Sequence, residues 1–242
     1  MKIALASYEF RNRDIDFNLE QIFFGMSKAS AFECDLVCFG EAFLQGFDAC
    51  HWNYAEDAAI GISLDHKLID QIRAYAAEMD IAVSFGMIEK NRDELYCSYV
   101  FIAKNGDIVD VFKRNSIGWK EFVKTDQHYK EGKGFFPFEY MEKRFVTALC
   151  GDMWEEDHVT AIKMLDKDIV LWPSYLTYSR QQWAKEKPQF VAQAAKTGAT
   201  TLFITSHTHK PLALGGAFVF DQGKVVQSLE LGSKGLLIYE TK

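Results

Sequence analysis

Residues 96–112 read YCSYVFIAKNGDIVDVF, and this stretch carries the clearest structural signal in the chain. Two runs rich in β-branched and aromatic residues, Tyr96–Ala103 and Ile108–Phe112, flank the pair Asn105-Gly106. Asn-Gly favours the positive φ angles of a tight turn between antiparallel strands. The stretch therefore predicts a β-hairpin whose second strand ends at Lys113.

Outward from this hairpin, short apolar runs alternate with longer helical patterns. The expected strands are residues 2–8, 35–39, 81–87, 145–149, 169–172 and 202–206, followed by a meander of 217–220, 225–228 and 236–239. The expected helices follow Asp14, begin at Ser63 as N-cap and run to Met79, and cover residues 157–165 and 181–196. These strands exceed the needs of a purely parallel sheet, which predicts an α/β fold with two mixed sheets covered by helices. No repeat or Pro/Gly-rich linker divides the chain, so we expect a single domain over residues 1–242.

The composition excludes several classes of protein. The 242 residues carry a net charge of -7, which disfavours a general nucleic-acid binder. No apolar run is long enough to cross a membrane, and the apolar start at Ile3–Ser7 is too short for a signal peptide. Five cysteines without regular spacing suit reduced thiols. We therefore expect a soluble cytoplasmic protein.

Three predicted strands end in residues that could carry chemistry. They are Phe39-Gly40-Glu41, Val111-Phe112-Lys113-Arg114 and Ala148-Leu149-Cys150-Gly151-Asp152. Each end alone is unremarkable, as a rim acid, a basic strand edge or a small buried thiol. Together they supply what a cysteine nucleophile needs, because Glu41 could take the thiol proton and Lys113 could stabilise negative charge. Gly151 leaves the backbone N–H after the cysteine open to a developing oxyanion.

The order Glu, Lys, Cys, each at a strand end, resembles the carbon–nitrogen hydrolase family, also called the nitrilase superfamily. Further matching motifs are Lys2-Ile3-Ala4-Leu5-Ala6, the loop from Glu41 to Phe47, Tyr96-Cys97-Ser98, Trp172-Pro173-Ser174, Gly215-Gly216, Gly223 and Gly235-Leu236-Leu237. The resemblance covers nearly the whole chain.

The resemblance implies an αββα sandwich in which two mixed sheets pack face to face and helices cover both outer faces. It assigns the general base to Glu41, the catalytic lysine to Lys113 and the nucleophile to Cys150. A second carboxylate that helps position lysine and substrate falls on Glu121. The implied reaction cleaves a small amide or carbamoyl amide with water through a thioester, without metal or cofactor. Members commonly form homodimers or higher homo-oligomers, so we expect a homo-oligomer and no nucleic-acid or membrane partner.

The chain departs from the family pattern in three places. The family's Arg-Lys-x-His-Leu reads Phe112-Lys113-Arg114-Asn115-Ser116 here, without the histidine. Its Tyr-Asp-x-Arg-Phe-Pro-Glu after the nucleophile becomes the segment from Gly151 to Asp157, which keeps Asp152 and loses the arginine. A later Arg-Ala-x-Glu-Asn becomes the segment from Gln193 to Thr197. These departures leave the subfamily and the substrate open.

Aromatic residues near the three strand ends are candidates for the walls of a substrate pocket. They are Trp119, Trp154, Tyr175 and Tyr178, and each could equally be a core aromatic. Arg180 could pair with a substrate carboxylate or lie on the surface.

Other functions stay open at this point. The same residues could hydrolyse a nitrile or pass the acyl group to an amine, and a related protein could bind a ligand without catalysis. His207-Thr208-His209 could hold a metal, or one of these histidines could serve Cys150 as base.

Overall fold

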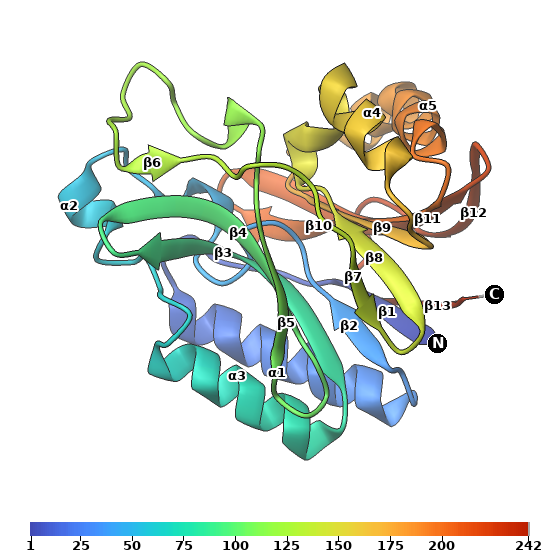
Figure 1. Cartoon of the computed structure of the whole chain (residues 1–242), viewed down its shortest axis with the longest axis horizontal. Coiled ribbons are helices and arrows are strands. Elements are labelled where there is room, and N and C mark those ends of the chain that lie inside the picture. Colours follow the sequence, from blue (N-terminus) through green and yellow to red (C-terminus); the bar gives the residue numbers. More distant parts are fainter. Residues whose placement is uncertain (242) are drawn as a thin grey trace.

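Two β-sheets packed face to face form the centre of the molecule, as the computed structural model of residues 1–241 shows (Figure 1). Helices α1 and α3 cover the outer face of one sheet, and α4 and α5 cover the outer face of the other. The prediction of two mixed sheets covered by helices is confirmed.

The elements have the following bounds. The strands are β1 (Lys2–Ser7), β2 (Leu36–Cys38), β3 (Ala82–Asn91), β4 (Glu94–Ile102), β5 (Ile108–Lys113), β6 (Tyr129–Lys130), β7 (Phe138–Tyr140), β8 (Lys143–Thr147), β9 (Ile169–Ser174), β10 (Thr200–His209), β11 (Leu212–Asp221), β12 (Lys224–Leu229) and β13 (Gly235–Glu240). The α-helices are α1 (Ile15–Ala31), α2 (Tyr54–Asp57), α3 (Lys67–Met79), α4 (Glu156–Met164) and α5 (Arg180–Lys196), and the 3₁₀ helices are η1 (Phe47–Ala49), η2 (Ile117–Trp119) and η3 (Cys150–Trp154). Within residues 1–241, no helix combines the length and apolar character needed to span a lipid bilayer.

Both sheets are mixed. Sheet A has the order β13-β1-β2-β3-β4-β5, with β6 also paired to β4, and sheet B has the order β12-β11-β10-β9-β8-β7. The central strands β1, β2 and β3 are parallel in sheet A, as are β8, β9 and β10 in sheet B, while the main flanking pairs are antiparallel. Glu41 is the third residue after β2 and Cys150 the third after β8, so each sheet supplies one strand end to the candidate site.

Helices α1 and α3 bury an apolar stripe on sheet A. The Asp14 side chain accepts a hydrogen bond from the backbone N–H of Phe17 and so caps the start of α1. Three buried residues of α1 (Leu19, Ile22 and Met26) and three of α3 (Ile69, Ile72 and Ala76) belong to the same apolar cluster as Val83 and Phe85 of β3. This packing leaves the opposite face of sheet A free to meet sheet B.

Helix α5 packs on sheet B through aromatic residues. Phe203 of β10 is fully buried, and its ring centroid lies 5.2 Å from that of Trp172 in β9 and 5.3 Å from that of Phe190 in α5. The ring of Trp183 stacks on the same phenylalanine at 5.7 Å. Phe203 therefore joins the sheet to the helix that covers it.

The structure differs from the predictions in three local features. In the β4–β5 hairpin only Gly106 has positive φ (84°), and its N–H bonds to the carbonyl of Ala103, so the connection is a turn with one left-handed residue. His66, not Ser63, caps α3. The first two strands of the predicted final meander pair as β11 and β12, but the third does not continue it, because β13 pairs with β1 of sheet A. Alternating apolar residues specify a strand but not its neighbour, so the sequence pattern did not reveal this exchange.

Replacing Phe203 by alanine should lower the free energy of unfolding by about 3–5 kcal/mol, because the cavity left under α5 cannot refill. Urea unfolding followed by circular dichroism measures this change. Phe122→Ala is the control, since that phenylalanine is 74% exposed and its loss should change stability by less than about 0.5 kcal/mol. Equal effects of the two substitutions would contradict the assignment of Phe203 to the core.

Candidate active site

Glu41 lies in a fully buried turn directly after β2. The chain from Phe39 to Gln45 is buried, and it is held against β3 by hydrogen bonds from Gly86 N–H to the Gly40 carbonyl and from Leu44 N–H to the Gly86 carbonyl. Gly86 must lack a side chain, because a Cβ there would lie 2.2 Å from the backbone nitrogen of Ala42. The carboxylate of Glu41 is therefore fixed by backbone contacts on a rigid sheet and is 0% exposed.

Cys150 opens a 3₁₀ turn after β8. Its φ of 41° is left-handed, a conformation that residues other than glycine rarely adopt without a surrounding structure that enforces it. The Trp172 indole N–H donates to the Cys150 carbonyl at 3.0 Å. Of the five cysteines, Cys150 alone is partly exposed, and the other four are buried.

Asp152 ties the cysteine turn to the end of β5. Its buried carboxylate accepts hydrogen bonds from the backbone N–H groups of Leu149 (3.0 Å), Asn115 (3.0 Å) and Ser116 (2.6 Å). Leu149 follows a strand of sheet B, and Asn115 and Ser116 follow a strand of sheet A. One buried carboxylate thus binds the two strand ends together.

The cation beside Glu41 is Arg114. Its Nη1 donates to Glu41 Oε1 at 2.8 Å, and the two side chains are 3% and 0% exposed. The backbone places Arg114 there, because its N–H donates to the Cys97 carbonyl at 2.9 Å and its carbonyl accepts from Gly132 at 2.8 Å.

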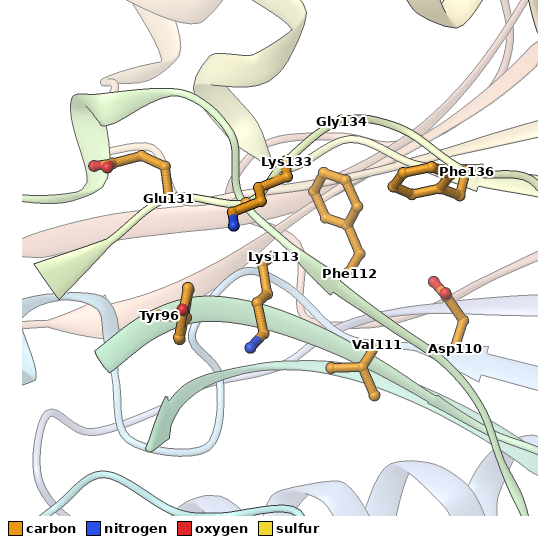
Figure 2. A pocket seen from close by; sticks show the side chains of 10 residues that line it. Tyr96, Asp110, Val111, Phe112, Lys113, Glu131, Lys133, Gly134 and Phe136 are labelled. Atoms are coloured by element: carbon orange, nitrogen blue, oxygen red, sulfur yellow. The ribbon is translucent and has the colours of Figure 1, made fainter. Parts of the chain in front are cut away.

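The structure does not bring the predicted lysine to Glu41. Lys113 points to the other side of β5, where its Nζ lies 3.2 Å from Glu89 Oε1 and 3.7 Å from the centroid of the Tyr96 ring. Adjacent residues of a strand point to opposite faces, so a shift of one residue exchanges Lys113 for Arg114. Figure 2 shows Lys113 beside Tyr96 at the edge of a groove of about 300 Å³ that none of Glu41, Arg114 and Cys150 lines.

The two oxygens of Glu41 have different surroundings. Oε1 accepts from Arg114 and from the Cys97 thiol, whose sulfur lies 3.6 Å away. Oε2 is buried and has no hydrogen-bond partner among residues 1–241. Glu41 is thus held by one oxygen, and the other is available to accept a proton.

Burial and the Glu41 charge act together on the cysteine. Desolvation, reinforced by the nearby carboxylate, raises the pKa of Cys150 to about 12, although Arg114 and a backbone hydrogen bond from Tyr175 oppose this rise. Burial lowers the pKa of Arg114, but Glu41 and Cys150 together raise it above its usual value, so the guanidinium stays charged. The resting site at neutral pH therefore holds a neutral thiol and a permanent cation.

The remaining predicted site residues lie in varied places. Glu121 is about half exposed, and its carboxylate forms an ion pair with Lys124 at 2.7 Å. This ion pair involves neither Glu41 nor Arg114. Trp119 is buried against Trp52 and Tyr129. Trp154 packs on Trp172 and Phe190. The Tyr175 ring packs on Phe10 and Phe47, while its backbone N–H faces Cys150.

Two further candidates also differ in their surroundings. Burial raises the pKa of Tyr178 most, followed by the charge of Glu186 and then by that of Cys150. The influence of Cys150 indicates that Tyr178 lies near the site. The Arg180 side chain donates to the Leu231 carbonyl at 3.1 Å.

The histidine pair has partners of its own. His207 Nε2 lies 3.1 Å from the Ser233 carbonyl, and His209 Nε2 lies 3.3 Å from Glu9. Within residues 1–241 no group of three or more His, Cys, Asp or Glu side chains could hold a metal ion.

Sequence reasoning missed Arg114, Ser116 and Cys97. The family motif Arg-Lys-x-His-Leu contained a signal for Arg114. Moved one residue along, it places its lysine on Arg114 and its leucine on Ile117, a better apolar match than Ser116. The contact between Cys97 and Glu41 joins residues far apart in the chain and left no local pattern.

Comparison with known proteins places the chain in a family and supports the fold. Residues 2–242 match the family described as Carbon-nitrogen hydrolase. The NitN amidase from Neterenkonia sp. AN1 superposes with a TM-score of 0.81 at 17% identity, over 100% of this chain and 93% of that one.

Two curated relatives match by sequence. A glutamine-dependent NAD(+) synthetase of Acinetobacter baylyi is 22% identical over 170 residues, 70% of this chain and 30% of that protein. An arylacetonitrilase of Hypocrea virens is 25% identical over 115 residues, 45% of this chain and 35% of that protein. The chain thus spans about a third of the length of these relatives.

The fold and the family match together define the class. The chain belongs to the carbon–nitrogen hydrolase family, and the αββα sandwich expected from the resemblance is confirmed.

Iodoacetamide should label Cys150 before the other four cysteines, which are buried. Because the pKa of Cys150 is raised to about 12, the labelling rate should keep rising above about pH 9, where an ordinary thiol is already ionised. Peptide mapping by mass spectrometry identifies the labelled residue, and Cys150→Ser should remove the early label. First labelling at Cys34 or Cys50 would contradict the site.

Proposed function

We propose that this protein hydrolyses the C–N bond of a small linear amide or carbamoyl amide through a thioester on Cys150. The observation that carries this proposal is the buried Glu41 carboxylate, held by Arg114 through one oxygen and free at the other, with the Cys150 thiol within its electrostatic influence. A free carboxylate oxygen beside a neutral thiol is the arrangement of a general base and its nucleophile.

The first half of the reaction forms the thioester. Glu41 Oε2 accepts the thiol proton while the Cys150 sulfur bonds to the amide carbon and the carbonyl electron pair moves onto oxygen. The Gly151 N–H and the neighbouring guanidinium stabilise this oxyanion. The intermediate then collapses, the C–N bond breaks, and Glu41 returns its proton to the leaving amine.

The second half consumes one water molecule. Glu41 removes a proton from water as the water oxygen bonds to the thioester carbon, and the C–S bond breaks to release the acid. The proton on Glu41 returns to the sulfur. One carboxylate therefore serves as base and acid in turn, and the protein supplies all the groups that move protons.

The relatives favour an amide over a nitrile. Among the similar structures, one mutant of an amidase from Nesterenkonia sp. AN1 is described in complex with butyramide, and another mutant of the same amidase shows acrylamide added to its active-site cysteine. The arylacetonitrilase matches less of this chain than the NAD(+) synthetase does. Nitrile hydrolysis and acyl transfer to an amine use the same thioester chemistry, and a non-catalytic binding role would need no free base.

A panel of short aliphatic amides, carbamoyl amides, glutamine and nitriles tests the proposal. Incubation with a true substrate should add the mass of its acyl group to the intact protein, and the mass should map to Cys150. Cys150→Ala should abolish both the adduct and turnover. Glu41→Gln should lower kcat at least about 100-fold, because it removes the base while keeping the shape of the side chain.

Lys113→Met is the matched control for the cation. Lys113 contacts Glu89 and Tyr96 but not Glu41, so this variant should keep activity within about threefold of wild type. Turnover that persists in Cys150→Ala, or an acyl mass on another cysteine, would refute the thioester route. Binding without turnover across the whole panel would favour the non-catalytic alternative.

A further inference from the structure

The guanidinium of Arg114 lies among four residues, namely Glu41, Ser116, Gly118 and Gly151. Nη1 donates to Glu41 Oε1 at 2.8 Å, and Nε donates to Ser116 Oγ at 2.8 Å. The third nitrogen, Nη2, lies against Gly151, where an added Cβ would stand only 2.3 Å from it. A Cβ on Gly118 would also lie 3.1 Å from Nη2. Because Gly118 and Gly151 lack side chains, there is room for Nη2 of Arg114.

These contacts connect the departures from the family pattern. With the motif moved one residue along, arginine stands where the pattern has lysine, and Ser116 stands where it has histidine. Gly151 stands where the pattern after the nucleophile has tyrosine. Arg114, Ser116 and Gly151 lie against one another. Three unrelated departures from the pattern would not be expected to meet at one place in the structure. The larger cation, the missing side chain and the small hydroxyl form one unit.

We propose that Arg114 is the catalytic cation of this enzyme, and that Gly151 and Ser116 are the positioning residues that allow an arginine to act there. This inference rests on the proposed function. Nη1 holds Glu41, while Nη2 lies beside the residue whose backbone N–H faces the oxyanion. Among residues 1–241, Nη2 has no hydrogen-bond acceptor, so it is available to the oxygen of the tetrahedral intermediate.

Arginine suits this double task for a geometric reason. Its planar fork presents donors in fixed directions, so it binds a carboxylate and a second anionic oxygen at once. A lysine ammonium is a point charge on a shorter and more flexible stem. With Gly151 in place, a lysine would leave the space beside the oxyanion empty.

Four proteins test the coupling: wild type, Arg114→Lys, Gly151→Ala and the double variant. We expect Arg114→Lys to lower kcat about 100- to 1000-fold, the usual cost of losing an oxyanion donor. Gly151→Ala should cause a similar loss, because its Cβ displaces Nη2. The kcat of the double variant should lie within about threefold of the kcat of Arg114→Lys, because lysine has no Nη2 to displace. Losses that multiply in the double variant, or wild-type activity of Arg114→Lys, would overturn the proposal.

Ser116 provides a second readout. Ser116→Ala should lower kcat about tenfold with little change in KM, and Ser116→Thr should restore most of the activity, because threonine keeps the hydroxyl that accepts from Nε. Equal activity of Ser116→Ala and wild type would remove Ser116 from the unit.

The same variants remain informative if one of them folds poorly. Should Gly151→Ala fail to fold, the contacts predict that adding both Arg114→Lys and Ser116→Ala restores folding, as judged by the unfolding midpoint in urea, because the new Cβ would lie 2.3 Å from Nη2 and 2.8 Å from Ser116 Oγ. Failure to restore it would overturn the steric part of the proposal. Absence of turnover in the wild-type protein on every substrate would instead refute the proposed function, and the urea midpoints would still report on the contact.

Discussion

The ion pair between Arg114 and Glu41 is the interaction on which the site depends. Both side chains are almost completely removed from water, so each charge requires the other. Breaking such a buried pair by removing one partner typically costs about 3–5 kcal/mol, far more than an exposed pair contributes. The fold meets this constraint with two segments that follow strands of sheet A and are fixed by backbone hydrogen bonds of Gly40, Leu44 and Arg114.

The same pair suits the proposed reaction, in which one carboxylate would act several times. Because Arg114 and Cys97 engage Oε1, the carboxylate does not rotate freely, and Oε2 keeps its direction. A neutral thiol and a held carboxylate exchange a proton only when the sulfur forms its bond. The site thereby avoids a permanently ionised cysteine, which would be open to oxidation.

Much of the fold and part of the site could be predicted from the sequence. Buried apolar strands and the Asn105-Gly106 turn are local signals, and Glu41 and Cys150 follow such strands directly. The cation was predicted one residue early, because Lys113 and Arg114 are both basic and only the side of β5 that each faces distinguishes them. The β13 exchange and the contact of Cys97 with Glu41 depend on tertiary packing, which no local pattern encodes. Glu121 was assigned from the resemblance alone, and the structure pairs it with Lys124.

Asp152 gives the sandwich an uneven stiffness. Its carboxylate fastens backbone groups from both sheets at one end of the interface, whereas a shared apolar cluster fills much of the remainder. Apolar layers tolerate small sliding motions because their contacts lack direction, but a carboxylate with three backbone donors does not. Sliding of one sheet on the other would have to break these directed bonds, so the Cys150 turn and the end of β5 keep their relative position.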